Sequence, residues 1–350
     1  MQIQIVDARN RILGAEHPDT VAAMATLAVT YYYLEKSTEA EKLQIQVVNA
    51  RNRILGAEHS GTISAMQNLA VTYCDLGKYS DAEKMQIQVV DARTKTLGAE
   101  HPDTVTVMEN LAVTYYYLEK YTEVEDMQIQ VFDARNRTLG AEHPDTVAAM
   151  ENLAVIYCDQ EKYTEAEKLQ IQVVVVRNRI LGAEHPDTVA AMASLAVTTY
   201  CLEKYIEAEK LEIQVVDSRK KILGPEHPDT VSAMANLALT YYDLEKYTEA
   251  EKLQIQVVDT QHRILGAEHP DTITAMQNLA STFKSLGKYI KQEELETQLI
   301  NAEKSVSGEE HKASVRNMVV LPASNVMDGR MDTPEKGTSF CHYFIYPNSH

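Results

Sequence analysis

The sequence has little of several features that would point to a specific chemistry. It contains four cysteines, none of them in a C-x-x-C arrangement: Cys74, Cys158, Cys201 and Cys341. These are too few for a disulfide framework, so we expect reduced thiols. No apolar run approaches the roughly 20 residues that span a bilayer, and the first residues lack the basic-then-apolar order of a signal peptide. We expect a soluble, cytoplasmic chain with no membrane partner.

Positive charge is also scarce. The chain has 33 lysines and arginines against 51 aspartates and glutamates, a net charge of −18. An acidic chain is repelled by the phosphates of nucleic acids and of anionic membranes. We therefore expect no nucleic-acid partner, and a protein or peptide partner that is neutral to basic.

Motifs of catalysis are missing as well. The sequence has no G-x-x-x-x-G-K-[ST], no G-x-S-x-G and no H-E-x-x-H, which disfavours common nucleotide, hydrolase and metalloprotease sites. Eight histidines recur at a spacing of 42 residues, from His17 to His311. Two helix layers of roughly 8 to 10 Å each would separate the histidines of successive repeats. Two imidazoles would then lie too far apart to bind the same metal ion. We interpret them as capping residues at helix starts, and expect no enzyme, metal or cofactor.

What the sequence does have is an internal repeat. The octapeptide LGAEHPDT or a variant of it recurs every 42 residues, starting at Leu13, Leu55, Leu97, Leu139, Leu181, Leu223 and Leu265, with a decayed copy at Ser307. A period of this length indicates stacked supersecondary units, each of which buries its apolar face against its neighbours.

The repeat from His143 to Glu184 divides into two predicted helices. Pro144 suits the first position of a helix, and apolar residues then recur at three- and four-residue steps, which is typical of one helical face: Val147, Met150, Leu153, Ala154 and Tyr157. After a short polar segment, Thr164 is the predicted N-cap of a second helix. In the second repeat, where Ser60 replaces the proline, we predict Ser60 as the N-cap.

The second helix carries a wide apolar surface that predicts contacts on two sides. One side holds Ala166, Leu169, Val173, Val176 and Ile180, and the other holds Ile171, Val174 and Leu181. Arg177 and Arg179 lie in the last turns, where cations suit the helix dipole. Gly182 is expected to adopt the left-handed conformation that ends the helix.

Leu153, Ala154 and Tyr157 in the first helix and Ala166 in the second fit the tetratricopeptide signature. The unit resembles the 42-residue tetratricopeptide (TPR) repeats of kinesin light chains, which open at HPD, continue through NLA and pass a G-K-Y turn before an E-A pair. It is most similar to the kinesin-light-chain-like arrays of fungal STAND or NLR-like proteins. The resemblance covers Met1 to about Leu321. It implies an all-α, TPR-like α-solenoid, a right-handed superhelix of antiparallel helix pairs with a 42-residue period.

The period also predicts the domain boundaries. Residues 1–16 form an orphan second helix, seven repeats follow at 17–58, 59–100, 101–142, 143–184, 185–226, 227–268 and 269–310, residues 311–321 are an aborted eighth repeat, and 322–350 a disordered tail. Met85 and Met127 hold the same repeat position as Met1, which leaves open that the array is part of a longer chain.

Comparison of the repeats separates constant positions from variable ones. A methionine is constant in the first helix, from Met24 to Met276, which indicates packing. The position directly after this methionine varies between repeats, and so does the position seven residues further on. In most repeats an asparagine stands directly after the first of these variable positions. We therefore predict a partner-binding surface made of Tyr32, Gln67, Asn68, Glu109, Asn110, Tyr116, Glu151, Asn152, Tyr200, Asn236, Tyr242, Gln277 and Asn278.

In TPR arrays this stripe lines the concave groove, so the resemblance implies a scaffold that binds a peptide or protein there. Two alternatives stay open from the residues: the variable stripe is drift on a solvated face, or the asparagines tie repeats together. A clamp for a peptide's C-terminal carboxylate is not supported, because only Lys284 is basic on the stripe. Alternative functions are the sensing fragment of a STAND or NLR-type nucleotide-binding receptor, and a kinesin-light-chain-like cargo adaptor.

Overall fold

A computed structural model of the chain describes residues 1–306, and within them the backbone forms fifteen helices joined by short turns, without a strand. Helix α1 (Gln2–Leu13) stands alone at the start. The first helices of the repeats are α2 (Pro18–Tyr33), α4 (Ser60–Asp75), α6 (Pro102–Tyr117), α8 (Pro144–Asp159), α10 (Pro186–Cys201), α12 (Pro228–Asp243) and α14 (Pro270–Ser285). The second helices are α3 (Ser37–Leu55), α5 (Tyr79–Leu97), α7 (Tyr121–Leu139), α9 (Tyr163–Leu181), α11 (Tyr205–Ile222), α13 (Tyr247–Leu265) and α15 (Tyr289–Val306).

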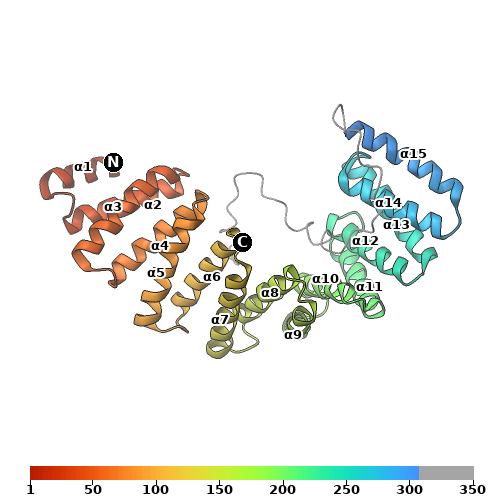
Figure 1. Cartoon of the computed structure of the whole chain (residues 1–350), viewed down its shortest axis with the longest axis horizontal. Helices are drawn as coiled ribbons and strands as arrows, with labels where there is room; N and C mark the ends of the chain where they lie inside the picture. The colour runs from red at the N-terminus through yellow and green to blue at the C-terminus, as the bar shows by residue number, and fades with distance from the viewer. Residues whose placement is uncertain (307–350) are drawn as a thin grey trace. The chain divides into compact units, whose positions relative to one another are not determined.

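The helices follow one another as sequential antiparallel pairs (Figure 1). The chain divides into two compact units, and the boundary in the sequence lies inside α8: one unit contains 1–156 and the other begins at Tyr157. In each unit a helix packs mainly against the helices before and after it in the chain. This is the nearest-neighbour packing expected of a repeat protein. The predicted aborted repeat and tail (311–350) lie outside the described residues.

The core is a series of small clusters along each unit. In the first unit, Val105 and Met108 of α6 pack with Val131 of α7 and Ala149 of α8. The constant methionines are 1–7% exposed, so their predicted packing role is confirmed: Met24, Met66, Met108, Met150, Met192, Met234 and Met276. The prediction for the second helix is wrong in part, because Ile171 and Ile180 are 46% and 54% exposed. Within residues 1–306 no helix is both long and apolar enough to cross a membrane.

Each first helix begins at a histidine, as predicted. The imidazole Nδ1 accepts a hydrogen bond from the backbone N–H two residues on, at 3.0–3.2 Å in all seven repeats. The prediction that Ser60 is the N-cap of α4 is wrong: His59 holds that position and accepts from Gly61. The extended backbone of His59 brings its ring to an N–H that lacks a partner within the helix.

The first helices end in a tight turn that backbone hydrogen bonds close. In the fourth repeat, Glu161 has a φ of 59°, its N–H donates to Cys158 O, and Lys162 N–H donates to Tyr157 O. This pair of bonds is the Schellman motif. Helix α9 then begins at Tyr163 with Lys162 as N-cap and no side-chain cap, so the prediction of Thr164 as N-cap is wrong. At its other end, Gly182 has a φ of 92°, the left-handed value expected there.

Charged pairs connect the second helices of neighbouring repeats. A lysine at the start of one second helix binds a mostly buried glutamate 37 residues earlier, at 2.6 Å for Lys78–Glu41, Lys204–Glu167 and Lys246–Glu209. Three such lysines also lie 5.7 Å from the centre of a tyrosine ring at the end of the first helix: Lys120, Lys162 and Lys246. These contacts add to the stacking of repeats on the side of the second helices.

Candidate partner-binding surface

The solvent-facing side of the first helices carries a row of asparagines. Asn68 is exposed, and Asn110, Asn152, Asn236 and Asn278 are partly exposed. A valine follows three residues after the asparagine position, hence on the same side of the helix, and is partly or fully exposed: Val29, Val71, Val113, Val155 and Val197. We call these asparagines and valines the asparagine face. Sequence comparison missed these valines because their position changes little between repeats, to Leu239 and Ser281 in the last two, although their spacing from the asparagines placed them on this side.

In the second and third repeats, the side chain at the first variable position lies against the second helix of the same repeat. Arg93 donates to Gln67 Oε1 at 2.7 Å, and Arg135 pairs with both carboxylate oxygens of Glu109 at 2.8 Å. Burial raises the pKa of Glu109 to about 7, against the lowering effect of Arg135. Glu151 is half-buried and Gln277 exposed. Gln67 and Glu109 therefore connect the two helices of a repeat.

A row of arginines connects most of the second helices to the next repeat. The guanidinium donates to a backbone carbonyl in the first turn of the following first helix, at 2.7–3.1 Å: Arg9 to Asp19, Arg51 to Gly61, Arg135 to Asp145, Arg177 to Asp187 and Arg219 to Asp229. The sequence predicted that Arg177 lies near the end of its helix, where its charge suits the helix dipole. Its partner ten residues away in sequence was not predictable from that position alone.

The predicted tyrosines are half-buried between repeats. Tyr200 OH donates to Asp243 Oδ2 at 2.5 Å, and Tyr242 OH lies 3.3 Å from Ser285 Oγ. Burial and the Asp243 carboxylate raise the pKa of Tyr200. Tyr116 lies edge-on to Tyr121, with ring centres 6.1 Å apart.

The remaining predicted tyrosine, Tyr32, is also half-buried and lies edge-on to Tyr33, with ring centres 5.7 Å apart. The tyrosines thus hold neighbouring side chains in place and present only part of their surface.

Two repeats carry a buried cysteine at the tyrosine position. The sulfur atoms of Cys74 and Cys158 lie 3.5 and 3.4 Å from the hydroxyls of Thr114 and Thr198. Burial raises the pKa of Cys158, and also raises that of the half-buried Cys201, to about 11. Cys74, Cys158 and Cys201 are free thiols, which agrees with the expectation for these cysteines. Cys341 lies outside the described residues.

The second helices contain a buried amide row that sequence reasoning missed. Gln44, Gln86, Gln128, Gln170 and Gln254 are 3–7% exposed, and Glu212 holds the same position at 4%. Gln86 Nε2 donates to the carbonyl of Asn110 in the next repeat, at 3.3 Å. In each of the five glutamines, Oε1 has no hydrogen-bond partner among residues 1–306. The signal in the sequence was a polar residue repeated at 42-residue spacing within the apolar pattern of the second helix.

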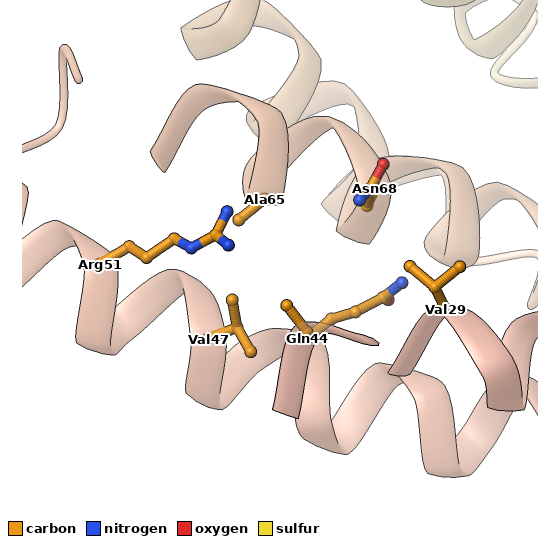
Figure 2. A pocket seen from close by; sticks show the side chains of 7 residues that line it. Val29, Gln44, Val47, Arg51, Ala65 and Asn68 are labelled. Carbon is orange, nitrogen blue, oxygen red and sulfur yellow. The ribbon is translucent and has the colours of Figure 1, made fainter. Parts of the chain in front are cut away.

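A small pocket opens between α2, α3 and α4, beside the asparagine face. Its walls include Val29, Gln44, Val47, Arg51, Ala65 and Asn68, whose side chains surround one space in Figure 2. It offers about 20 Å³ to a water-sized group, which is room for one such group and not for a drug-sized molecule. Among the described residues no group of three His, Cys, Asp or Glu side chains is placed to hold a metal ion.

Comparison with protein families decides what these repeats are. Tetratricopeptide repeat models match residues 34–95, 62–137, 103–161, 145–221 and 230–271. The chain belongs to the tetratricopeptide repeat family. The matching models describe repeats and not a catalytic family. No curated protein matches the sequence.

Solved structures with similar TPR arrays come from several sources. Nearly identical TPR-like repeats from Podosopora anserina, assigned to a kinesin light chain, are 30% identical, with a TM-score of 0.54 over 60% of this chain and 100% of that one. A STAND protein with a tetratricopeptide repeat sensor from Pyrococcus horikoshii is 15% identical, with a TM-score of 0.56 over 82% of this chain and 44% of that one. A TPR repeat-containing protein from Cytophaga hutchinsonii is 12% identical, with a TM-score of 0.57 over 82% and 99%. The last two share the fold alone.

Proposed function

We propose that this TPR array is a scaffold that binds an extended peptide segment of a partner protein on the asparagine face. The observation that carries the proposal is a carboxamide at the same exposed or partly exposed place in five of the seven repeats. In four of these five an apolar residue stands three positions further on: Val71, Val113, Val155 and Leu239. A carboxamide donates and accepts hydrogen bonds, so it suits the backbone of an extended chain whatever its side chains. Val71, Val113, Val155 and Leu239 provide apolar contact next to the amides of their repeats.

The alternative that the asparagines only tie repeats together has less support. The ties between repeats are made by other groups: the arginine row, the lysine–glutamate pairs and the tyrosine hydroxyls. Asn110 contributes its backbone carbonyl, which accepts from Gln86 and Thr114. A backbone carbonyl does not require an asparagine side chain, so the carboxamide needs another explanation.

The proposed partner is neutral to basic, and neither a nucleic acid nor a membrane. The net charge of −18 supports this, since it attracts cationic segments and repels phosphate-rich surfaces. Glu109 contributes less than its sequence position suggested, because Arg135 neutralises it in place. The attraction therefore comes from the summed charge of the array.

The test is selection of binding peptides from a displayed library of random peptides on three forms of the full chain. These are the unaltered chain, the pair Asn110→Ala with Asn152→Ala, and the matched pair Gln88→Ala with Gln130→Ala. The matched pair removes exposed amides from the second helices instead of the first. We expect one peptide consensus on the unaltered chain and the glutamine variant, and its loss on the asparagine variant. A consensus that survives on the asparagine variant contradicts the proposal.

A further inference from the structure

The pocket between α2, α3 and α4 contains a buried acceptor that lacks a donor. Gln44 is 6% exposed, lines the pocket, and its Oε1 has no hydrogen-bond partner among the described residues. Figure 2 shows the Gln44 side chain extending along the pocket between Val29 and Asn68. A buried carbonyl oxygen without a donor is costly, and it favours any occupant that brings a hydrogen to it.

The first variable position holds a small residue in this repeat, as it does at Ala193 and Ala235. Ala25 is part of the pocket wall. In the next two repeats the corresponding side chains are Gln67 and Glu109, and they bind the arginines Arg93 and Arg135. Ala25 cannot reach Arg51 in this way, so the space beside Gln44 is left for another group.

Size and polarity restrict what that group is. The room of about 20 Å³ admits one water-sized group. An ammonium group would lie beside the guanidinium of Arg51, and a carboxylate would face the Gln44 carbonyl oxygen, so both charged groups are disfavoured. The apolar walls formed by Val29, Val47 and Ala65 suit a methyl or methylene. A hydroxyl on a short side chain satisfies all of these conditions.

We propose that this pocket is a subsite for a serine or threonine side chain of a peptide bound on the asparagine face, with the hydroxyl donating to Gln44 Oε1. The inference rests on the proposed function and adds a specificity determinant to it. The peptide backbone lies along Asn68, at the rim of the pocket. The subsite restricts the peptide residue that lies beside Asn68 to one with a short side chain.

The experiment repeats the peptide selection on three variants. Gln44→Met removes the acceptor and keeps the length of the side chain, and Ala25→Gln fills the space as Gln67 does in the next repeat. Gln46→Met makes the same chemical change on an exposed residue of α3 and is the control. We expect serine or threonine at one fixed position of the consensus on the unaltered chain and on the control. Both pocket variants should lose this preference and keep the rest of the consensus.

An affinity measurement then isolates the hydroxyl. For a selected peptide, Thr→Val at the fixed position should weaken binding roughly 3- to 10-fold on the unaltered chain and not on Gln44→Met. An equal loss on both forms, or a consensus without a fixed serine or threonine, overturns the subsite and shows that the pocket holds water only. If peptides bind through Asn110 and Asn152 without this preference, only the subsite fails. If no peptide is enriched, the proposed function fails with it.

Discussion

Glu212 is a buried carboxyl in the row of buried glutamines on the second helices. It occupies the position at which five other repeats place a buried glutamine, and it is 4% exposed. Burial raises the pKa of its carboxyl to about 8. Burying a glutamine at this place costs much less free energy than burying an ionised glutamate, because the glutamine carries no charge that must be removed from water.

Glu212 should therefore make stability depend on pH. In the unfolded chain a glutamate titrates near its ordinary pKa of about 4.3, so between that value and pH 8 the folded state binds the extra proton. Stability contributed by this group is complete below pH 4 to 5 and is lost as the pH rises through about 8. Glu212→Gln should remove this loss, which is on the order of a few kcal/mol.

Hydrogen exchange of α11 and α12 at several pH values measures this effect, and Glu207→Gln on the exposed side of α11 is the control. The interpretation is wrong if Glu212→Gln leaves the pH dependence of these helices unchanged. The sequence did not reveal the burial of Glu212, because a single glutamate in an acidic chain looks like a solvated residue.

At the scale of the helix, the sequence predicted the elements well and their ends less well. The 42-residue period and the spacing of Met150, Leu153 and Ala154 were sufficient for the helix pairs. Ser60 and Thr164 were wrongly predicted as caps because serine and threonine are common N-caps. In this chain the histidine ring caps the first helix of each repeat. The second helix instead follows a turn that is closed by backbone hydrogen bonds.

The turn after the first helix offers a test of backbone strain. Glu119 has a φ of 57°, whereas Gly77 holds the same place in the second repeat at 68°. A residue with a Cβ is strained in this region and glycine is not, so Glu119→Gly should stabilise the third repeat by about 1 kcal/mol.

The reverse change, Gly77→Glu, should destabilise the second repeat by a similar amount. Amide hydrogen exchange in α6 and α7 for the first variant, and in α4 and α5 for the second, reports the local change. Equal protection in both variants and the unaltered chain would show that the turn is not strained.

At the scale of the whole chain, the family and the repeat architecture were predictable from the sequence, and the detail of the binding surface was not. The candidate residues were chosen by variation between repeats, together with the recurring asparagine next to the first variable position. Variation does not separate an exposed residue such as Asn68 from one that is bound to a partner 26 residues away, as Gln67 is to Arg93. The valines of the asparagine face were missed because their position changes little between repeats, so a search for variation passed over them.

The net charge leads to a prediction about salt. Because the chain carries a charge of −18, a basic peptide should bind more weakly as the ionic strength rises, mainly through a slower association rate. A neutral peptide from the same selection is the control and should respond less. Stopped-flow or surface-based kinetics at several salt concentrations measure both. An affinity for the basic peptide that does not change with salt would show that the summed charge does not select the partner.

The central claim is that partners bind through the carboxamides of the asparagine face. The most direct measurement is the Kd of one selected peptide for the variant that combines Asn110→Ala with Asn152→Ala. We expect Kd to rise roughly 10-fold or more, because two hydrogen bonds to the peptide backbone are lost. The matched variant, Gln88→Ala with Gln130→Ala, should stay within about twofold of the unaltered chain. An unchanged Kd for the asparagine variant, or an equal rise in both variants, would contradict the account.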